Sequence, residues 1–154
     1  MATVATSVFD VGDFLPYLLN QAAEHMGENF QSQYKQQYGM LRTEWRVLFH
    51  LGKYGQLTAT EICEYAKMHK TKISRAVVAL QAKRFLVRKE NPNDRRQEQL
   101  SLTKSGEKVY RNLVASAEQY ENEITEKFSR EEIAALKSML KRLSRSSVEA
   151  NYYL

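Results

Sequence analysis

Residues 68–102, MHKTKISRAVVALQAKRFLVRKENPNDRRQEQLSL, decide the fold that this chain should adopt. Apolar side chains at the i, i+3, i+4 and i+7 spacing predict a helix over residues 70–83 whose buried face is Ile73, Ala76, Val77 and Leu80. The opposite face is short-chained, polar and cationic, and it carries Thr71, Arg75 and Val78, flanked by Lys72 and Ser74. A helix with such a face can enter the major groove of DNA.

The segment after this helix predicts a small β-hairpin. Residues 85–90 and 97–102 should form two strands, and residues 91–96, NPNDRR, a turn whose tip carries Arg95 and Arg96. A helix with a cationic face followed by a basic hairpin indicates a winged helix-turn-helix.

Positive charge is concentrated in the same part of the chain. The 154 residues carry a formal net charge of +5. Residues 67–96 hold ten basic and two acidic side chains, a net charge of +8, so the rest of the chain is net −3. A local excess of this kind is typical of a surface that binds phosphates.

Three helices are predicted before this region. The first covers residues 14–37, with Asp13 as a candidate cap and Pro16 in its first turn, and it should stop at Gly39. The second covers residues 42–54. Thr58 and Glu61 form a capping box that opens a short third helix over residues 59–66.

Two further helices should follow the hairpin. Thr103 is the predicted N-cap of the first of them, and Ser129 with Glu132 forms a second capping box that opens the last helix. The predicted fold class is therefore mainly α with a small β-hairpin.

The residue content and motifs of the sequence argue against several classes of protein. The chain has one cysteine, Cys63, so no internal disulfide is expected, which suits a reducing compartment. No apolar run approaches the ~18 residues of a membrane span, and the N-terminus does not resemble a signal peptide, so the cytoplasm is the expected location. The sequence lacks a phosphate-binding loop, a nucleophile elbow and metal-ligand spacing, so no catalytic residue, cofactor or metal is predicted.

The order of these elements and five motifs resemble the MarR (multiple-antibiotic-resistance regulator) family of bacterial transcription factors. The motifs are TEWRVL at 43–48, LTATEI at 57–62, KISRAV at 72–77, NPNDRR at 91–96 and LSLTKSG at 100–106. The resemblance extends from about Phe14 to Leu143 and includes Asp94 and Arg96 in the hairpin.

The resemblance implies an obligate homodimer on a palindromic DNA operator. Residues 1–40 and 103–154 would then supply dimerisation helices, and residues 41–102 the winged helix-turn-helix, all within one protomer. It also implies a small effector, often a phenolic or other aromatic carboxylate, that binds between the dimerisation and DNA-binding parts and weakens DNA binding.

Two positions depart from the family pattern. Arg84 stands where the family usually has glycine, so positive φ at this position would cost of order 1 kcal/mol. Leu41 stands where a capping threonine usually precedes the second helix. The hydrophobic residue after the helix at 70–83 is kept as Phe85.

Two groups of side chains are candidates for contact with DNA. On the helix, Arg75 should reach guanine while its polar neighbours hold phosphates, and in the hairpin two arginines should contact the minor groove or phosphates. Asp94 should brace Arg96 through a charge-assisted hydrogen bond. The alternative is a solvated helix face and a charged turn that serves solubility. The full predicted set is Lys70, Thr71, Lys72, Ser74, Arg75, Asp94, Arg95 and Arg96.

An effector site is predicted around the second helix. Arg46 beside Trp45 offers a guanidinium for a carboxylate next to an aromatic wall, and His25 and Tyr110 could join them. The alternative is that Trp45 belongs to the core and Arg46 is exposed or forms a structural ion pair. Cys63 is expected to be a small buried filler.

The resulting hypothesis is a ligand-responsive, sequence-specific DNA-binding regulator that acts as a homodimer, with repression favoured over activation. The competing hypothesis is a winged-helix interaction module whose basic face meets an acidic protein rather than DNA.

Overall fold

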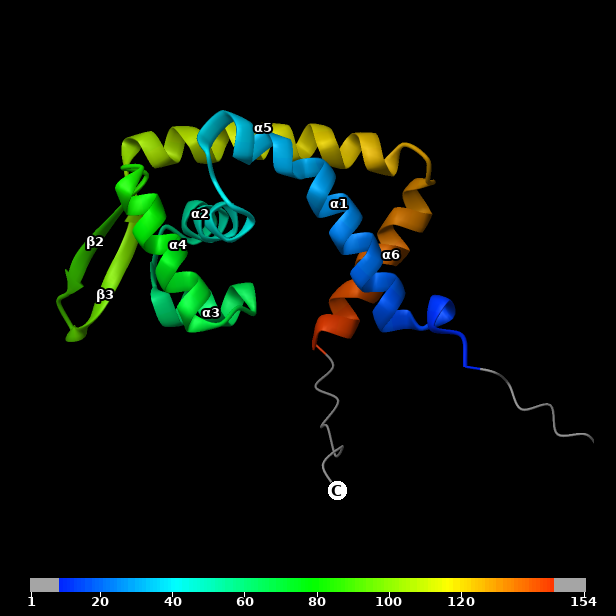
Figure 1. Cartoon of the computed structure of the whole chain (residues 1–154), viewed down its shortest axis with the longest axis horizontal. Helices are drawn as coiled ribbons and strands as arrows, with labels where there is room; N and C mark the ends of the chain where they lie inside the picture. The colour runs from blue at the N-terminus through cyan, green and yellow to red at the C-terminus, as the bar shows by residue number, and fades with distance from the viewer. Residues whose placement is uncertain (1–8, 146–154) are drawn as a thin grey trace, which may run out of the picture. The chain divides into compact units, whose positions relative to one another are not determined.

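The computed structural model describes residues 9–145, apart from the side chain of Arg95, and the chain divides into two compact units. The first unit is residues 1–114 and the second is residues 115–154. The elements, in chain order in Figure 1, are a 3-10 helix η1 (Val11–Asp13), α1 (Leu15–Tyr38), α2 (Arg42–Tyr54), β1 (Gln56–Thr58), α3 (Ala59–Ala66), α4 (Lys70–Ala82), β2 (Leu86–Asn91), β3 (Asp94–Leu102), α5 (Lys104–Thr125) and α6 (Arg130–Arg145).

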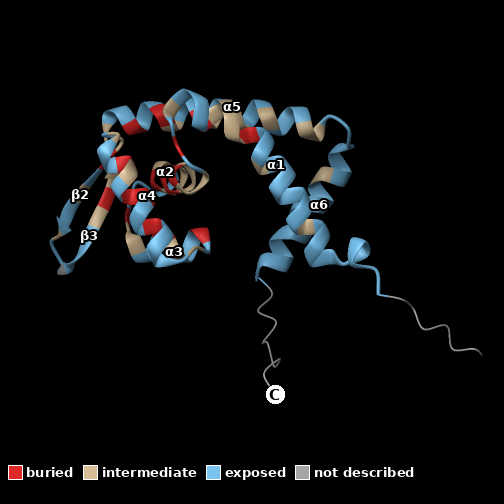
Figure 2. Cartoon of the chain, viewed as in Figure 1, coloured by how far each residue is buried: buried red, intermediate tan, exposed pale blue. Residues whose placement is uncertain are grey.

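The core of the first unit lies among α2, α3, α4 and the sheet (Figure 2). All four apolar residues predicted to line the inner face of α4 are buried, as are Leu48 and Leu51 of α2. Ile62 and Ala66 of α3 are buried too. The helical periodicity of the sequence therefore identified the inner face of α4 correctly. Trp45 of α2 is only half-buried.

The starts of the helices agree with the predicted caps, with one exception. Glu61 N donates to Thr58 Oγ1 at 3.2 Å and Thr58 N donates to Glu61 Oε2 at 2.7 Å, which completes the capping box of α3. Ser129 and Glu132 make the same pair of bonds at α6. The prediction for Asp13 was wrong, because this residue lies in η1 and Phe14, which has no side-chain cap, precedes α1.

The sheet has three antiparallel strands in the order β1-β3-β2. The sequence analysis missed β1, which is only three residues long and pairs Leu57 with Leu100. It also began the last strand too late, since β3 starts at Asp94 and follows a two-residue turn made by Pro92 and Asn93.

The arginines of the hairpin consequently lie in β3 rather than at the tip of the turn. The register of β2 and β3 runs regularly from Leu86–Leu102 to Glu90–Glu98 and then shifts, so that Asn91 pairs with Asp94. Residues 95–97 therefore have no partner in the β2 register and form a bulge-like irregularity.

The joint between α4 and the wing, which is the hairpin of β2 and β3, has a strained backbone conformation at Arg84. Arg84 has φ of 62°, in the left-handed region that favours glycine. Hydrogen bonds fix this conformation, since Arg84 N donates to Gln81 O at 2.9 Å and Phe85 N donates to Leu80 O at 2.9 Å. Thr103 Oγ1 donates to Arg84 O at 2.7 Å and also accepts from Gly106 N, which confirms Thr103 as a helix cap.

Within the second unit, α6 has a pronounced apolar stripe but no buried residue. Its apolar side chains Leu136, Met139, Leu140 and Leu143 are all 40% or more exposed. An ion pair between Lys137 and Glu121 joins α6 to the end of α5. The described helices include none that is long and apolar enough to cross a membrane.

Candidate nucleic-acid interface

The outward face of α4 presents the side chains that the sequence singled out. Lys70, Thr71, Lys72, Ser74 and Arg75 are all exposed, on the side of the helix opposite its buried residues. Because the inner face anchors α4 to α2 and α3, the backbone of the outer face is held rigidly while its polar ends stay free to contact a partner.

A hollow of about 410 Å³ lies between α4 and the wing. Three predicted DNA-binding residues line it, namely Lys70 and Ser74 from α4 and Arg96 from β3. The fold therefore brings together cations that are up to 26 positions apart in the sequence (Lys70 to Arg96). Further lining residues that the sequence analysis did not select include Thr60, Arg88, Gln97 and Glu98.

Arg88 is the most informative of these additional residues. Its Nη1 donates to Glu98 Oε2 at 3.1 Å across the β2–β3 ladder. Its Nε is buried and has no hydrogen-bond partner among the side chains that the structure describes. The strand alternation could have identified it, since Arg88 follows the buried Leu86 by two residues and so shares the face of β2 that is turned toward the helices.

Asp94 contacts Arg96, the predicted residue, but through its backbone rather than its guanidinium. Its Oδ1 accepts a hydrogen bond from the backbone N of Arg96 at 3.0 Å, so the carboxylate orders the start of β3 rather than pairing with the guanidinium. The predicted donor was therefore wrong, because the hydrogen bond comes from the backbone N–H of Arg96 and not from its guanidinium. The side chain of Arg95 lies outside the described part of the chain.

Arg46 has a structural contact in the first unit. Its Nη2 donates to the carbonyl oxygen of Ala66 at 2.7 Å, which ties α2 to the end of α3. Burial lowers the pKa of Arg46, and the positive charge of Arg42 lowers it further. This geometry favours the structural alternative for Arg46 over the predicted role in binding a carboxylate.

Trp45 lies within a connected series of aromatic rings. Its ring is 5.6 Å from those of Phe30 and Tyr34 and 4.8 Å from that of Phe49, between centroids. Phe49 in turn lies 5.4 Å from Tyr110, so one intervening ring joins two of the predicted effector residues. Trp45 Nε1 is buried, and its interaction with the Tyr34 hydroxyl lowers the pKa of that phenol, although burial raises this pKa more strongly. His25 is exposed on α1 and lies within hydrogen-bond distance of Asn29.

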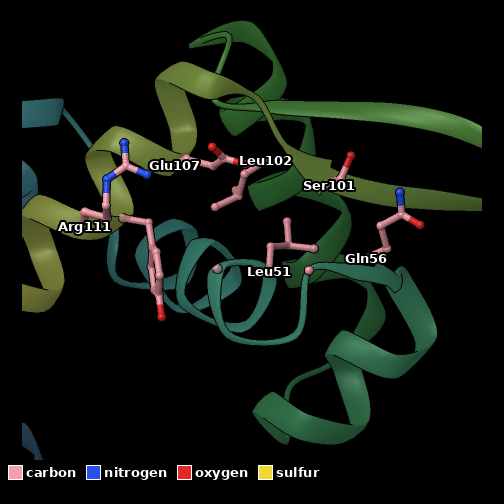
Figure 3. Close-up of a pocket in the computed structure, with 9 residues that line it drawn as sticks. Leu51, Gln56, Ser101, Leu102, Glu107 and Arg111 are labelled. Atoms are coloured by element: carbon pink, nitrogen blue, oxygen red, sulfur yellow. The ribbon is translucent and has the colours of Figure 1, made fainter.

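Tyr110 also lines an open hollow of about 600 Å³ at the root of the wing (Figure 3). Leu51 of α2 and Leu102 of β3 form an apolar part of its wall, and Glu107 and Arg111 of α5 add one negative and one positive side chain. Gly52 allows the close approach of α2 and α5, because a Cβ there would lie 2.3 Å from the ring of Tyr110. Of the four predicted effector residues, only Tyr110 lines this hollow.

The last two features to consider are the cysteine and possible metal ligands. Cys63 is half-buried rather than fully buried. Among residues 9–145, no group of three or more histidine, cysteine or acidic side chains could hold a metal ion.

The fold is a winged helix-turn-helix, and a hollow lined by cationic side chains lies between α4 and the wing. Residues 38–97 match the sequence model of the MarR family. The uncharacterized HTH-type transcriptional regulator YwoH of Bacillus subtilis (strain 168) is 24% identical over 131 residues, which cover 85% of this chain and 94% of YwoH. The part of the chain that the model matches is therefore similar to the MarR family of transcriptional regulators.

Solved structures show the same fold over most of the chain. BpsR of Bordetella bronchiseptica, whose DNA binding is regulated by 6-hydroxynicotinic acid, superposes with a TM-score of 0.81 at 18% identity, covering 91% of this chain and 99% of BpsR. MepR of S. aureus, in a complex with DNA, superposes with a TM-score of 0.74 at 20% identity, covering 84% of this chain and 96% of MepR.

Proposed function

We propose that this protein is a homodimeric, ligand-responsive regulator that binds a palindromic DNA operator, with repression as its main effect. The observation that carries the proposal is the hollow between α4 and the wing, where Lys70, Ser74 and Arg96 converge beside Arg88. Cationic side chains of α4 and of the wing face the same hollow. They could bind at the edge of a DNA groove, where both phosphates and base edges can be contacted. A regulator of this kind would act in the cytoplasm.

In this proposal α4 enters the major groove. Arg75 donates two hydrogen bonds to guanine, and Lys70, Thr71, Lys72 and Ser74 hold phosphates at the groove edge. Arg95 and Arg96 contact the flanking minor groove or its phosphates. Two such protomers would place their helices in successive major grooves about one turn of DNA apart.

Self-association is supported by the exposed apolar side chains outside the DNA-binding region. On α6 these are Leu136, Met139, Leu140 and Leu143, and on α1 they include Leu15 and Leu18. An apolar stripe of this width on a helix is ordinarily covered by a neighbouring element. We assign both stripes to contacts between two copies of the chain.

The effector is proposed to be a small aromatic or carboxylate compound. The regulation of BpsR by 6-hydroxynicotinic acid supports this class. The indole of Trp45 and the phenol of Tyr110, joined through the ring of Phe49, offer hydrogen-bonding groups within an aromatic environment. Trp45 is the single tryptophan of the chain, so its fluorescence reports binding at this place.

The first test is a gel shift against the DNA upstream of the protein's own gene. We expect a specific complex at moderate salt, and we expect Arg75→Ala to weaken it by about 1–3 kcal/mol and to relax the base preference at one position in each half-site. Lys70→Ala is the matched control, because loss of a phosphate contact should weaken binding to all sequences alike and reduce the salt dependence. Binding to acidic proteins without any preferred DNA sequence would favour the competing interaction module.

The second test concerns the effector. Titration with 6-hydroxynicotinic acid and other aromatic carboxylates should change the fluorescence of Trp45 and dissociate the DNA complex over the same concentration range. A differential affinity of about 1–3 kcal/mol between the two states would suffice. Dissociation without any change in fluorescence would place the effector elsewhere.

A further inference from the structure

Val78 lies in the middle of the outward face of α4. At about 100° per residue it is within roughly 20° of Thr71 and roughly 40° of Ser74 around the helix axis. Its side chain is 57% exposed, although it is a large apolar residue surrounded by polar and cationic neighbours. Val78 also lines the hollow between α4 and the wing, beside Lys70 and Ser74.

Neither helix propensity nor packing within the described part of the chain explains a valine at position 78. Valine is a poorer helix former than alanine because its branched side chain loses rotamer freedom in a helix. Its exposure means that the isopropyl group buries little surface against α2, α3 or the wing. Single exposed apolar residues are common on proteins, but this one is central on a face that we assign to DNA.

We propose that Val78 contacts the 5-methyl group of thymine in the major groove of the operator. The proposal rests on the proposed DNA-binding function and identifies one base of the target. The thymine methyl is the apolar group that a base pair presents in the major groove, and an aliphatic side chain is its complementary partner. Cytosine has a hydrogen in place of this methyl, so the contact also distinguishes pyrimidines.

The position of Val78 relative to Arg75 predicts which bases are neighbours. Three residues of helix separate the two positions by about 4.5 Å along the axis. One base-pair step is about 3.4 Å. The guanine contacted by Arg75 and the thymine contacted by Val78 should therefore belong to the same or adjacent base-pair steps of each half-site.

The experiment begins with the preferred duplex, selected by the full-length protein from random DNA. Each thymine is then replaced by uracil, which removes the methyl group and keeps all hydrogen-bonding groups. One thymine in each half-site should be sensitive, and its replacement should weaken binding roughly 4-fold, the ratio that corresponds to one buried methyl-sized group. Replacement in both half-sites should weaken binding by roughly the square of that ratio.

A variant then assigns the effect to Val78. In Val78→Ala the uracil and thymine duplexes should bind almost equally, while the preference for guanine at the neighbouring position remains. Val87→Ala is the matched control, since Val87 is a valine on β2 that is 37% exposed and does not line the hollow, and it should keep the full thymine preference.

The outcomes separate this proposal from the proposed function. If no DNA sequence is selected, the proposed function itself is wrong. If a sequence is selected but uracil is tolerated at every thymine, or if Val78→Ala keeps the same ratio between thymine and uracil, DNA binding stands and the assignment of Val78 is overturned.

Discussion

Arg84 holds a backbone conformation that only glycine adopts at little cost. Its φ of 62° connects α4 to the wing, and the carbonyl of the same residue accepts a hydrogen bond from Thr103. The surrounding hydrogen bonds therefore maintain the strained conformation. Lys67, at the end of α3, has φ of 51° and is a second non-glycine residue in this region, which the sequence did not reveal.

Replacement of Arg84 by glycine should stabilise the protein. Relief of the left-handed strain is worth about 1 kcal/mol, and the exposed arginine side chain makes little contact that would be lost. Urea unfolding should show this increase in the free energy of unfolding. Gln81→Gly, at an exposed helical position three residues earlier, should instead cost about 1 kcal/mol. A destabilised Arg84→Gly variant would contradict the strain argument.

His50 makes stability depend on pH. Burial lowers the pKa of its imidazole, and the positive charges of Arg46 and Lys53 lower it further. Tyr54 and Tyr65 lie 6.2 Å from its ring, between centroids. Because the unfolded chain protonates near its ordinary pKa of about 6.5, the unfolded state binds more protons, and stability falls as the pH drops below that value toward the lower folded pKa.

The variant His50→Gln should therefore lose part of this dependence. Between pH 7 and 5 its melting temperature should fall less steeply than that of the wild type. Comparison at pH 8, where imidazole is neutral in both states, gives the separate effect of the substitution on packing. Parallel slopes for the two proteins would show that His50 does not contribute to the acid sensitivity.

Among the elements, α2 and α3 begin in contrasting ways. The capping box of α3 satisfies two backbone donors through Thr58 and Glu61. The N-cap of α2 is Leu41, which makes no side-chain cap bond, so the predicted weakness at this position is confirmed. Glu44, at the third position of α2, is buried and lies 3.2 Å from Lys83 at the end of α4, where it contributes to the contact between the two helices.

Replacement of Leu41 by serine should stabilise α2 by about 1 kcal/mol, because a hydroxyl can accept a hydrogen bond from an unsatisfied N–H of the first turn. Leu41 is 57% exposed, so the apolar area lost is small. Thr58→Ala should destabilise the protein by a similar amount. Thermal unfolding of both variants tests the argument, and equal stability of Leu41→Ser and wild type would show that solvent already satisfies this helix end.

At the scale of the whole molecule, the exposed apolar stripe of α6 is the strongest indication that a second copy of the chain covers this helix. Leu140→Glu places a charge in the centre of this stripe and should raise the dissociation constant of the proposed dimer at least roughly 10-fold, since a buried unpaired carboxylate is costly. Ser138→Glu adds the same charge on the opposite face of α6 and should leave the constant unchanged. Sedimentation velocity over a dilution series measures both, and an unchanged Leu140→Glu dimer would exclude the stripe from the interface.

The sequence by itself determined the elements whose signals are local. The capping box at Thr58 and the helix stop at Gly39 depend on contacts within about five residues, so residue type and spacing suffice to predict them. The buried face of α4 was predictable because the spacing of its apolar side chains is a local pattern. The similarity to the MarR family likewise rests on short motifs, and the family model matches residues 38–97.

Tertiary structure alone decided the features that depend on distant segments. The strand β1 exists because Leu57 pairs with Leu100, and the hollow beside α4 exists because the wing folds back to bring Arg88 and Arg96 near Ser74. Arg46 likewise finds its acceptor in another helix, at Ala66. Such contacts follow from chain packing rather than from periodicity, so the candidate DNA-binding face of α4 was predictable while the shape of the site around it was not.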